Sequence, residues 1–586
     1  MERRNFLKSA AIAGAGVATG ARCTSQSLAL SQEQNPVPPP TYAPIVAANM
    51  TAKSQSAAAD LGVRVYNIRD YGAKGDGTTL DTSALQAAID ACHTDGGGTV
   101  LVPAGIFLIG AVELKSNLTL HIAASGKLMG SGDGKQYHAI DAIPLKGDAT
   151  LPDGNWALLY AVNASNIAVE GAGTIDGQGA QFRSPAPGVA APSGLSDLRR
   201  PYHILLFHCD RVTIKDLALV DCAYHSIRIV QSKHIHLDNI YIHNRVNANG
   251  DGFHFISAEH VSISNCTVYS QDDSCAMFGS CQFITITNCV FSTRWSVFRF
   301  AGGVARNIVV SNCILQKVYG CPIKFQGNSG ARFENISFAN LLLDDVTGPI
   351  HISVGPREPG RPVNEGLTPD LPVALQVPPV ARNISFSNIH GTVTSNPGPL
   401  PDVPPGDDTY SDGERFNCIT LNAAGDAVME NITFDNIDLT FGGGGTSEIA
   451  ARRKLPNLAS EYFMLGPMPA YGLYARNSRA VTLKNVRFQL ATPDLRPALI
   501  LDHVQDAAID SLSVQSDLAS ESALRFINAK DVLMTAVRLI TPATVFIQLE
   551  GTANTNLKVY CGDLSKAASQ LSLKDGATAD MIEIRS

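Results

Sequence analysis

Two acidic motifs hold the residues of this chain that are best suited to chemistry. The first motif, residues 249–252, reads Asn-Gly-Asp-Gly and contains Asp251. The second, residues 271–274, reads Gln-Asp-Asp-Ser and contains Asp272 and Asp273. The separation of Asp251 and Asp273 is close to the repeat of the surrounding sequence. We therefore expect the three carboxylates to meet on one surface.

Three carboxylates on one surface suit the acid and base steps of glycosidic-bond hydrolysis. An inverting enzyme needs one protonated carboxylic acid at the leaving oxygen and an opposed carboxylate, about 6.5–9.5 Å away, that activates water. Adjacent strands lie about 4.8 Å apart, so residues on neighbouring strands can span that gap. Crowding also raises the pKa of one carboxyl group, which keeps it protonated. The alternatives are a solvated acidic turn and a calcium site; we favour hydrolysis and expect no metal and no cofactor.

Short repeats of alternating apolar and polar residues surround the acidic motifs. Alternation over a short run of residues is strand periodicity. The fifth residues of the repeats align, and the first six of them follow one another at short, slightly unequal steps, whereas the last three follow at steps about twice as long. The longer steps are either two turns of the repeat or one turn with a long loop. The aligned residues are Asp216, Asn239, Asn265, Asn288, Asn312, Asn340, Asn388, Asn436 and Asn485.

These repeats predict an all-β fold, a parallel β-helix in which each turn of the chain, or coil, adds one layer. No single repeat can bury its own apolar face, so stacked repeats must share one core. A leucine-rich repeat is the rival fold, but its Leu-x-x-Leu-x-Leu-x-x-Asn pattern is absent from the sequence. The repeated Asn tolerates left-handed backbone and can bond to its counterpart on the next coil. Cys266, Cys289 and Cys313, each following such an Asn, are expected to form an internal stack.

A short helix is predicted at the N-terminal end of the repeats. Leu85, Ile89 and Cys92 fall on one helical face, while Ser83 and Gln86 are spaced as a capping box. The helix would cover the open end of the β-helix, where strand edges lack partners.

The chain divides into an export signal, a linker and the β-helix. Residues 1–29 resemble a twin-arginine signal, with Arg3 and Arg4 before a stretch of small apolar residues, and 30–62 form a proline-rich linker. The β-helix is expected over 63–586, with loop insertions at about 356–379, 396–413 and 442–469. Long loops on a rigid solenoid commonly wall a binding groove. We expect a periplasmic or extracellular protein.

Composition narrows the partners further. The net charge of −8 and the pI of about 6.0 provide no basic field for nucleic acid. No segment after the signal is long and apolar enough for a transmembrane helix, so we expect no membrane anchor, and we expect a monomer. Cys275 and Cys281 could form a disulfide, although buried thiols are favoured.

A set of motifs in a fixed order resembles glycoside hydrolase family 28, the polygalacturonases. The resemblance covers about residues 63–520 and implies a right-handed, single-stranded parallel β-helix that hydrolyses a pectin-like chain with inversion. It also implies that Asp272 is the general acid and that Asp251 and Asp273 activate water. The motifs that carry it lie at 173–179, 200–201, 249–251, 272–273, 320–324, 469–474 and 496–498.

The sequence departs from the family pattern at three positions next to the acids. The Gly-His-Gly motif of the family is replaced by a segment in which Arg294 stands near the His position. The Arg-x-Lys motif reads Pro322-Ile-Lys324, so only the Lys matches, and the Gly before the acidic pair is Gln271. The catalytic carboxylates are therefore retained, while the groups that hold the substrate's sugar have changed.

Nearby cations are candidates for binding the substrate in place of the missing groups. Counting by repeats places Arg228, Asp251, Asp273 and Arg294 in one column on four coils. Arginine can donate a planar pair of hydrogen bonds to a uronate carboxylate, or it can hold the Asp side chains in place. Lys324 is either a substrate ligand or a solvated charge.

Further residues are weaker candidates for substrate binding. Asn249 belongs to the first acidic motif. Trp295 would stack on a sugar ring or be buried in the fold. His225 and His254 are candidates too, although histidines satisfied within a turn or core are more common.

Two other functions remain open at this point. A polysaccharide lyase on the same fold would use calcium and a basic residue, and its unsaturated product absorbs in the near ultraviolet. A non-catalytic, glycan-binding β-helix would bind without turnover. The clustered acids favour a glycoside hydrolase that acts on a pectin-related, galacturonan-like polysaccharide or oligosaccharide.

Overall fold

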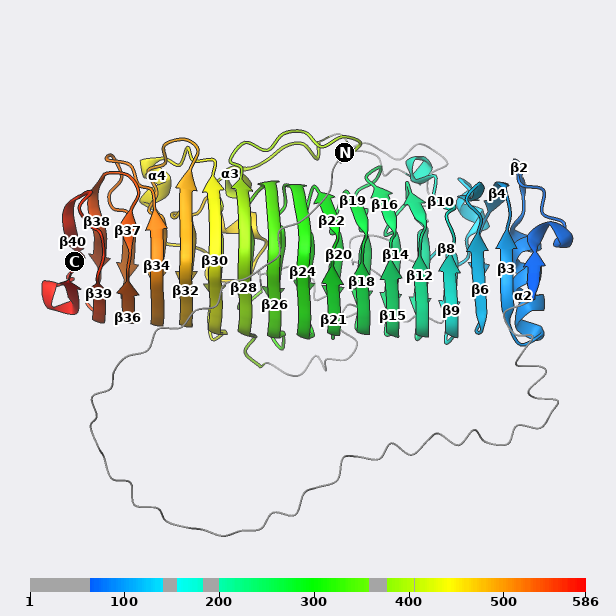
Figure 1. Ribbon diagram of the computed structural model, residues 1–586, viewed down its shortest axis with the longest axis horizontal. Coiled ribbons are helices and arrows are strands. Elements are labelled where there is room, and N and C mark those ends of the chain that lie inside the picture. Colours follow the sequence, from blue (N-terminus) through cyan, green and yellow to red (C-terminus); the bar gives the residue numbers. More distant parts are fainter. Residues whose placement is uncertain (1–63, 141–154, 183–199, 358–376, 405, 586) are drawn as a thin grey trace, which may run out of the picture. The chain divides into compact units, whose positions relative to one another are not determined.

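The computed structural model describes residues 64–140, 155–182, 200–357, 377–404 and 406–585 (Figure 1). The predicted signal (1–29), the linker (30–62) and most of the first insertion (358–376) lie outside the described residues. Within this part of the chain, the strands form parallel sheets that run along a β-helix, as the repeat predicts.

One sheet carries a single strand from each coil. It holds 15 strands within the described ranges, and each strand pairs in parallel with the strand of the next coil. The strands are β5 (Val112–Glu113), β8 (Ala157–Val162), β11 (Tyr202–Phe207), β14 (Ile227–Val230), β17 (Phe253–Ile256), β20 (Cys275–Phe278), β23 (Phe298–Ala301), β25 (Ile323–Gly327), β27 (Ile350–Val354), β29 (Ile419–Ala423), β31 (Leu473–Arg476), β33 (Leu499–Asp502), β35 (Leu524–Ile527), β38 (Ala543–Glu550) and β40 (Ala567–Lys574).

The other strands form a second, 26-stranded sheet in the same described ranges. It contains the sequence repeats, as paired short strands at first and as single long strands from β24 onward. The strands are β1 (Val65–Asn67), β2 (Asp76–Leu80), β3 (Gly98–Val102), β4 (Gly105–Ile109), β6 (Leu118–Ile122), β7 (Gly126–Gly130), β9 (Ser165–Glu170), β10 (Thr174–Asp176), β12 (Asp210–Lys215), β13 (Ala218–Val220), β15 (Lys233–Asp238), β16 (Tyr241–Asn244), β18 (Glu259–Ser264), β19 (Thr267–Ser270), β21 (Gln282–Thr287), β22 (Val290–Thr293), β24 (Val304–Val318), β26 (Arg332–Val346), β28 (Val380–Val393), β30 (Val428–Phe441), β32 (Arg479–Leu490), β34 (Gln505–Val514), β36 (Lys530–Thr535), β37 (Arg538–Leu539), β39 (Thr555–Tyr560) and β41 (Ile582–Arg585).

The apolar positions of successive repeats stack in register and fill the core. Val212 pairs with Ile235, which pairs with Val261, and the column continues through Ile284 and Ile308. All five side chains are almost fully buried. One continuous apolar core therefore runs through the coils, and this shared burial makes the repeat a stable structure.

The repeated Asn residues form a ladder that crosses the second sheet, and from β24 onward they lie within its long strands. Each aligned residue from Asp216 to Asn485 has a positive φ, between 50° and 60°. The Nδ2 of Asn388 donates to the Oδ1 of Asn340 at 2.9 Å, and Asn436 donates in turn to Asn388 at 2.8 Å. Because β26, β28, β30 and β32 pair directly, each of the long steps in the repeat is one coil with a long loop.

Helix α2 (Thr82–Thr94) covers the N-terminal end of the β-helix, as predicted. Its side chains Leu85, Ile89 and Cys92 are fully buried against the first coils.

The capping box expected for this helix is wrong. The N-cap residue is Asp81, whose carboxylate accepts hydrogen bonds from the backbone N–H groups of Lys74 and Gly75. Gln86 contacts the backbone of Glu113 instead. The tertiary contacts of the first coil thus decide the local hydrogen bonds.

Within the described residues, the other α-helices lie in or directly after two of the predicted insertions. The insertion at 396–413 leads into α3 (Asp412–Arg415), and the insertion at 442–469 contains α4 (Ser447–Ala450) and η5 (Tyr462–Leu465). The 3₁₀ turns elsewhere are η1 (Ile68–Tyr71), η2 (Gly134–Gln136), η3 (Gly179–Phe182) and η6 (Ala579–Met581).

The cysteines of the described residues are free thiols. Cys275 and Cys281 are buried and form no disulfide, and the backbone N–H of Cys266 points at the Sγ of Cys289, 3.4 Å away, in the expected stack. None of the helices in the described residues has the length and apolarity that a membrane crossing requires.

Candidate active site

The two acidic motifs lie on adjacent coils, immediately before β17 and β20. Phe253 pairs with Cys275, and the N–H of Gly252 donates to the carbonyl oxygen of Asp273 at 3.0 Å. Gly252 packs so tightly that a Cβ there would lie 2.6 Å from the carbonyl oxygen of Ser274. The motif needs glycine at this position because the next coil leaves no room for a side chain. The register brings Asp251 and Asp273 to the same level of the sheet.

Asp272 is the partly exposed member of the acidic cluster. Its Oδ1 accepts from the backbone N–H of Asp273 at 2.9 Å, and its Oδ2 accepts from Asn249 Nδ2 at 3.3 Å. Burial of the carboxyl group, helped by the negative charge of Asp273, raises the pKa of Asp272 to about 7. The nearby Lys324 ammonium opposes this shift. Asp272 therefore retains its proton in mildly acidic solution.

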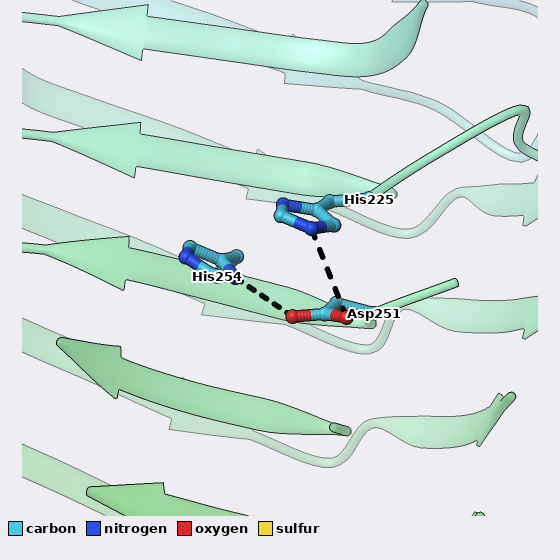
Figure 2. A group of neighbouring side chains, drawn as sticks. All are labelled: His225, Asp251 and His254. Carbon is cyan, nitrogen blue, oxygen red and sulfur yellow. Dashed lines mark hydrogen bonds and ion pairs between the residues drawn. The ribbon is translucent and has the colours of Figure 1, made fainter. Parts of the chain in front are cut away.

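Asp251 lies deeper, against two histidines (Figure 2). Its Oδ2 is 2.7 Å from His254 Nδ1, and its Oδ1 is 3.8 Å from His225 Nε2. Burial, followed by the charges of Asp272 and Asp273, raises the pKa of Asp251 well above its ordinary value. Asp251 and Asp273 stand level on adjacent coils and Asp272 precedes Asp273 in the chain, so the three acids form one cluster.

The two histidines are buried, stacked and held in the neutral form. Their ring centroids are 4.2 Å apart with an angle of 12° between the planes, and burial lowers the pKa of both rings well below the ordinary value. The ligand atoms of His225, Asp251 and His254 lie within 4.8 Å of one another, so among the described residues these three are candidates for holding a metal ion. However, imidazole lone pairs lie in the ring plane, and two nearly parallel rings do not direct them to one point. The arrangement fits a hydrogen bond between Asp251 and a neutral His254 better.

Asp273 is fixed from the following coil. Its Oδ1 accepts from the backbone N–H of Ser296 at 3.1 Å, and its Oδ2 is 4.0 Å from Arg299 Nε. These contacts fix the carboxylate without occupying all of its lone pairs.

The predicted column of Arg228, Asp251, Asp273 and Arg294 is wrong. Arg228 pairs with His254 rather than with Asp251, because the coil that joins Arg228 to His254 is longer than the usual repeat. Arg294 lies in the turn before β23, ahead of Ser296, the residue level with Asp273. Coil lengths vary with the turns, so counting by a fixed period does not give the register.

Arg228 supports the acids from within the fold. It is 1% exposed, its Nη1 donates to the Tyr202 hydroxyl, and its guanidinium lies 5.0 Å from the centre of the Tyr202 ring. Its positive charge also lowers the pKa of Asp251, against the effect of burial. The structure thus places Arg228 inside the fold against Tyr202, where its charge acts on Asp251.

Arg294 anchors the insertion at 396–413. Its Nη2 donates to Glu414 Oε1 at 2.8 Å and to the carbonyl oxygen of Thr409 at 3.1 Å, and its Nε donates to the carbonyl oxygen of Asp407. Gln271 contacts the same loop, because its Nε2 donates to Asp407 Oδ2 at 2.6 Å. Two of the departures from the family pattern, Gln271 and Arg294, therefore brace one inserted loop beside the acids.

Lys324 is nearly buried and pairs in register with Arg299. Its Nζ is 2.9 Å from Glu461 Oε2, in the insertion at 442–469, and 5.7 Å from the centre of the partly exposed Trp295 ring. Trp295 also packs near Phe463, with ring centroids 6.0 Å apart.

Sequence reasoning missed Arg299 and Glu461. Arg299 could have been found, since it is the polar residue between Phe298 and Phe300 and one coil before Lys324. Glu461 belongs to an insertion without repeats, so the sequence contains no signal for its position.

Comparison with known proteins identifies the family. The sequence profile of Glycosyl hydrolases family 28 matches residues 92–398, just over half of the chain, and the chain belongs to this family. It is thus a glycoside hydrolase by family.

Three relatives show how far the similarity extends. An exo-poly-alpha-D-galacturonosidase from Dickeya chrysanthemi is 31% identical over 36% of this chain and 41% of the relative. A probable polygalacturonase from Vitis vinifera is 32% identical over 49% of this chain and 56% of the relative. The chain thus spans about half the length of these two proteins. The structure of the Yersinia enterocolitica family 28 exopolygalacturonase matches with a TM-score of 0.50 at 17% identity, over 80% of this chain and 78% of that one, and shows the shared fold.

Proposed function

We propose that this protein hydrolyses a glycosidic bond of a pectin-related polysaccharide or oligosaccharide with inversion at the anomeric carbon. The observation that carries the proposal is the three-carboxylate cluster, in which Asp272 is partly exposed and has a pKa raised to about 7. Membership of family 28 and the two polygalacturonase relatives support a galacturonan-like substrate.

The proposed reaction is a single displacement. Asp272 donates its proton to the glycosidic oxygen as the bond from that oxygen to the anomeric carbon breaks. Asp251 and Asp273 position a water molecule on the opposite face of the sugar and take up one proton from it as its oxygen bonds to the anomeric carbon. The products are a hemiacetal with inverted configuration and a free hydroxyl group. One proton has moved from Asp272 to the leaving group, and another from water to the paired acids.

Neutral His254 orients Asp251 for this step. When its Nδ1 carries the hydrogen, the ring donates to Asp251 Oδ2 and fixes the position of the carboxyl group. Arg228 adds a buried positive charge that favours the ionised form of Asp251, as a general base requires.

The proposed substrate-binding residues border the acidic cluster. We assign this role to Asn249, Lys324 and Trp295, since Asn249 contacts Asp272 and the partly exposed Trp295 lies over Lys324. Export through a signal at residues 1–29, and action as a monomer outside the cytoplasm, remain predictions of the sequence.

The test is hydrolysis by wild type and by Asp272→Asn on a panel of pectic fractions. We expect wild type to release reducing ends and the variant to lose turnover by at least about 10², because general acid catalysis contributes about 10²–10⁴. Asp408→Asn, which changes an exposed carboxylate in the neighbouring insertion, is the matched control. Near wild-type turnover of the Asp272 variant, or a product that absorbs in the near ultraviolet, would contradict the proposal.

A further inference from the structure

Two cations at the edge of the acidic cluster share one carboxylate. Arg299 on β23 and Lys324 on β25 pair in register on adjacent coils. Arg299 Nη2 is 2.8 Å from Glu461 Oε1, and Lys324 Nζ is 2.9 Å from Glu461 Oε2. Each oxygen of Glu461 therefore binds a different cation.

These three charges border the proposed general acid. Arg299 Nε is 4.0 Å from Asp273 Oδ2, and the pKa of Asp272 responds to Lys324 and Glu461 with opposite signs. The Trp295 ring lies 5.7 Å from Lys324 Nζ. A sugar that stacks on Trp295 with its glycosidic oxygen at Asp272 would thus lie next to Lys324 and Glu461.

The two positive and two negative side chains beside the proposed general acid already balance one another. Arg299 and Lys324 each carry a positive charge, and Asp273 and Glu461 each carry a negative charge. Arg299 and Lys324 are 7% and 3% exposed, and burying an unpaired charge at such a site is costly. A uronate carboxylate would add an uncompensated negative charge, or would have to displace Glu461.

We propose that Glu461 determines specificity, because it neutralises Lys324 and Arg299 and thereby selects a neutral sugar at this position. The hydroxyl groups of a neutral sugar can donate to Glu461 and accept from Lys324 without disturbing the charge balance. This inference rests on the proposed hydrolase function, and it narrows the substrate to a pectic chain in which one sugar beside the cleaved bond is uncharged.

The experiment compares an oligogalacturonate with the same oligosaccharide after its carboxylates are reduced to primary alcohols. We expect wild type to have the higher kcat/KM on the reduced oligosaccharide. Glu461→Gln frees the two cations and should shift the ratio of kcat/KM values toward the charged oligosaccharide by at least about 10-fold. The double variant Glu461→Gln, Lys324→Met should lose most of that gain.

Two control variants separate charge from packing. Glu461→Asp keeps the charge and should keep the wild-type ratio. Glu448→Gln removes a carboxylate from the same insertion at α4 and should leave the ratio unchanged. A better rate of wild type on the charged oligosaccharide, or an equal ratio in wild type and Glu461→Gln, would overturn the inference.

A binding measurement distinguishes this failure from failure of the proposed function. Calorimetry measures the affinities of Asp272→Asn and of the double variant Asp272→Asn, Glu461→Gln for the two oligosaccharides. These affinities report the preference for the reduced or the charged oligosaccharide without turnover. If neither oligosaccharide is hydrolysed by wild type but the reduced one binds more tightly to Asp272→Asn, the reaction is wrong and the specificity stands. Tighter binding of the charged oligosaccharide to Asp272→Asn, or binding of neither, would overturn the specificity.

Discussion

The acidic cluster and the group of Arg299, Lys324 and Glu461 beside it, here called the cation cluster, are built in different ways. Asp251, Asp272 and Asp273 stand on two consecutive coils, and the strand register alone brings them together. Arg299 and Lys324 also stand on consecutive coils, but Glu461, which joins them, comes from an insertion much later in the chain. The regular coils thus supply the proposed chemistry, whereas the insertions set the surroundings of the substrate.

The same division explains two of the three departures from the family pattern. Gln271 and Arg294 lie on the coils beside the acids, yet both contact the inserted loop at 396–413. A change in a loop can therefore require changes at the edge of the active site, while the acids on the coils stay as they are.

The largest loss of stability is expected where the insertion at 396–413 contacts the coil that carries Arg294. Arg294→Gln leaves Glu414 buried without its cation, and breaking a buried ion pair costs about 3–5 kcal/mol. We expect a lower melting temperature and faster proteolysis of the loop at 396–413. Arg306→Gln, at an exposed position on β24, is the control. Wild-type stability of Arg294→Gln together with a raised KM for acidic substrates alone would show instead that Arg294 binds a uronate.

A smaller effect is expected in the regular coils. Asn388→Ala removes two hydrogen bonds of the Asn ladder and places alanine at a φ of 52°. The left-handed backbone alone costs about 1–2 kcal/mol for an ordinary residue. Chemical denaturation should show this loss of stability, while kcat stays at the wild-type value because the ladder does not contact the acids. Asn388→Gly restores the backbone freedom and should recover part of the loss. A large fall in kcat in either variant would mean that the coils and the site are more tightly coupled than the contacts indicate.

The smallest expected effect is a shift in the pH dependence of kcat/KM when a charge of the cation cluster is removed. Asp272 must be protonated to act as the acid, so kcat/KM should fall as the pH rises through its pKa of about 7. Lys324 lowers the pKa of Asp272 and Glu461 raises it. The alkaline limb of the pH profile should therefore move to higher pH in Lys324→Met and to lower pH in Glu461→Gln. Movement of the limb in the same direction in both variants would contradict this electrostatic assignment.

The contrast between regular coils and insertions also decides which features could be predicted from the sequence. The β-helix, the Asn ladder and the meeting of the three acids could be predicted, because each depends on a repeat that the sequence displays. The column of arginines could not be predicted by counting, because the coil from Arg228 to His254 is longer than the coil from His254 to Ala276. Only the register, set by the turns, decides which residues are level.

The contacts of the insertions could not be predicted at all. Nothing in the sequence near Glu461 indicates that it meets Lys324, since loops outside the repeat follow no period. Arg294 illustrates the same limit. Its type and its place near the acids suggested a substrate ligand, but its donors are directed to the backbone of a distant part of the chain, at Asp407 and Thr409.

The most direct test of the central claim is the stereochemistry of the first product. If Asp272 protonates the leaving oxygen while Asp251 and Asp273 activate water, the anomeric carbon inverts in one displacement. Early-time NMR of a hydrolysed oligosaccharide should then show the anomer opposite to that of the substrate before mutarotation mixes the two forms. Retention of the substrate's configuration would mean that one of the acids acts as a nucleophile, and would contradict the roles assigned to all three.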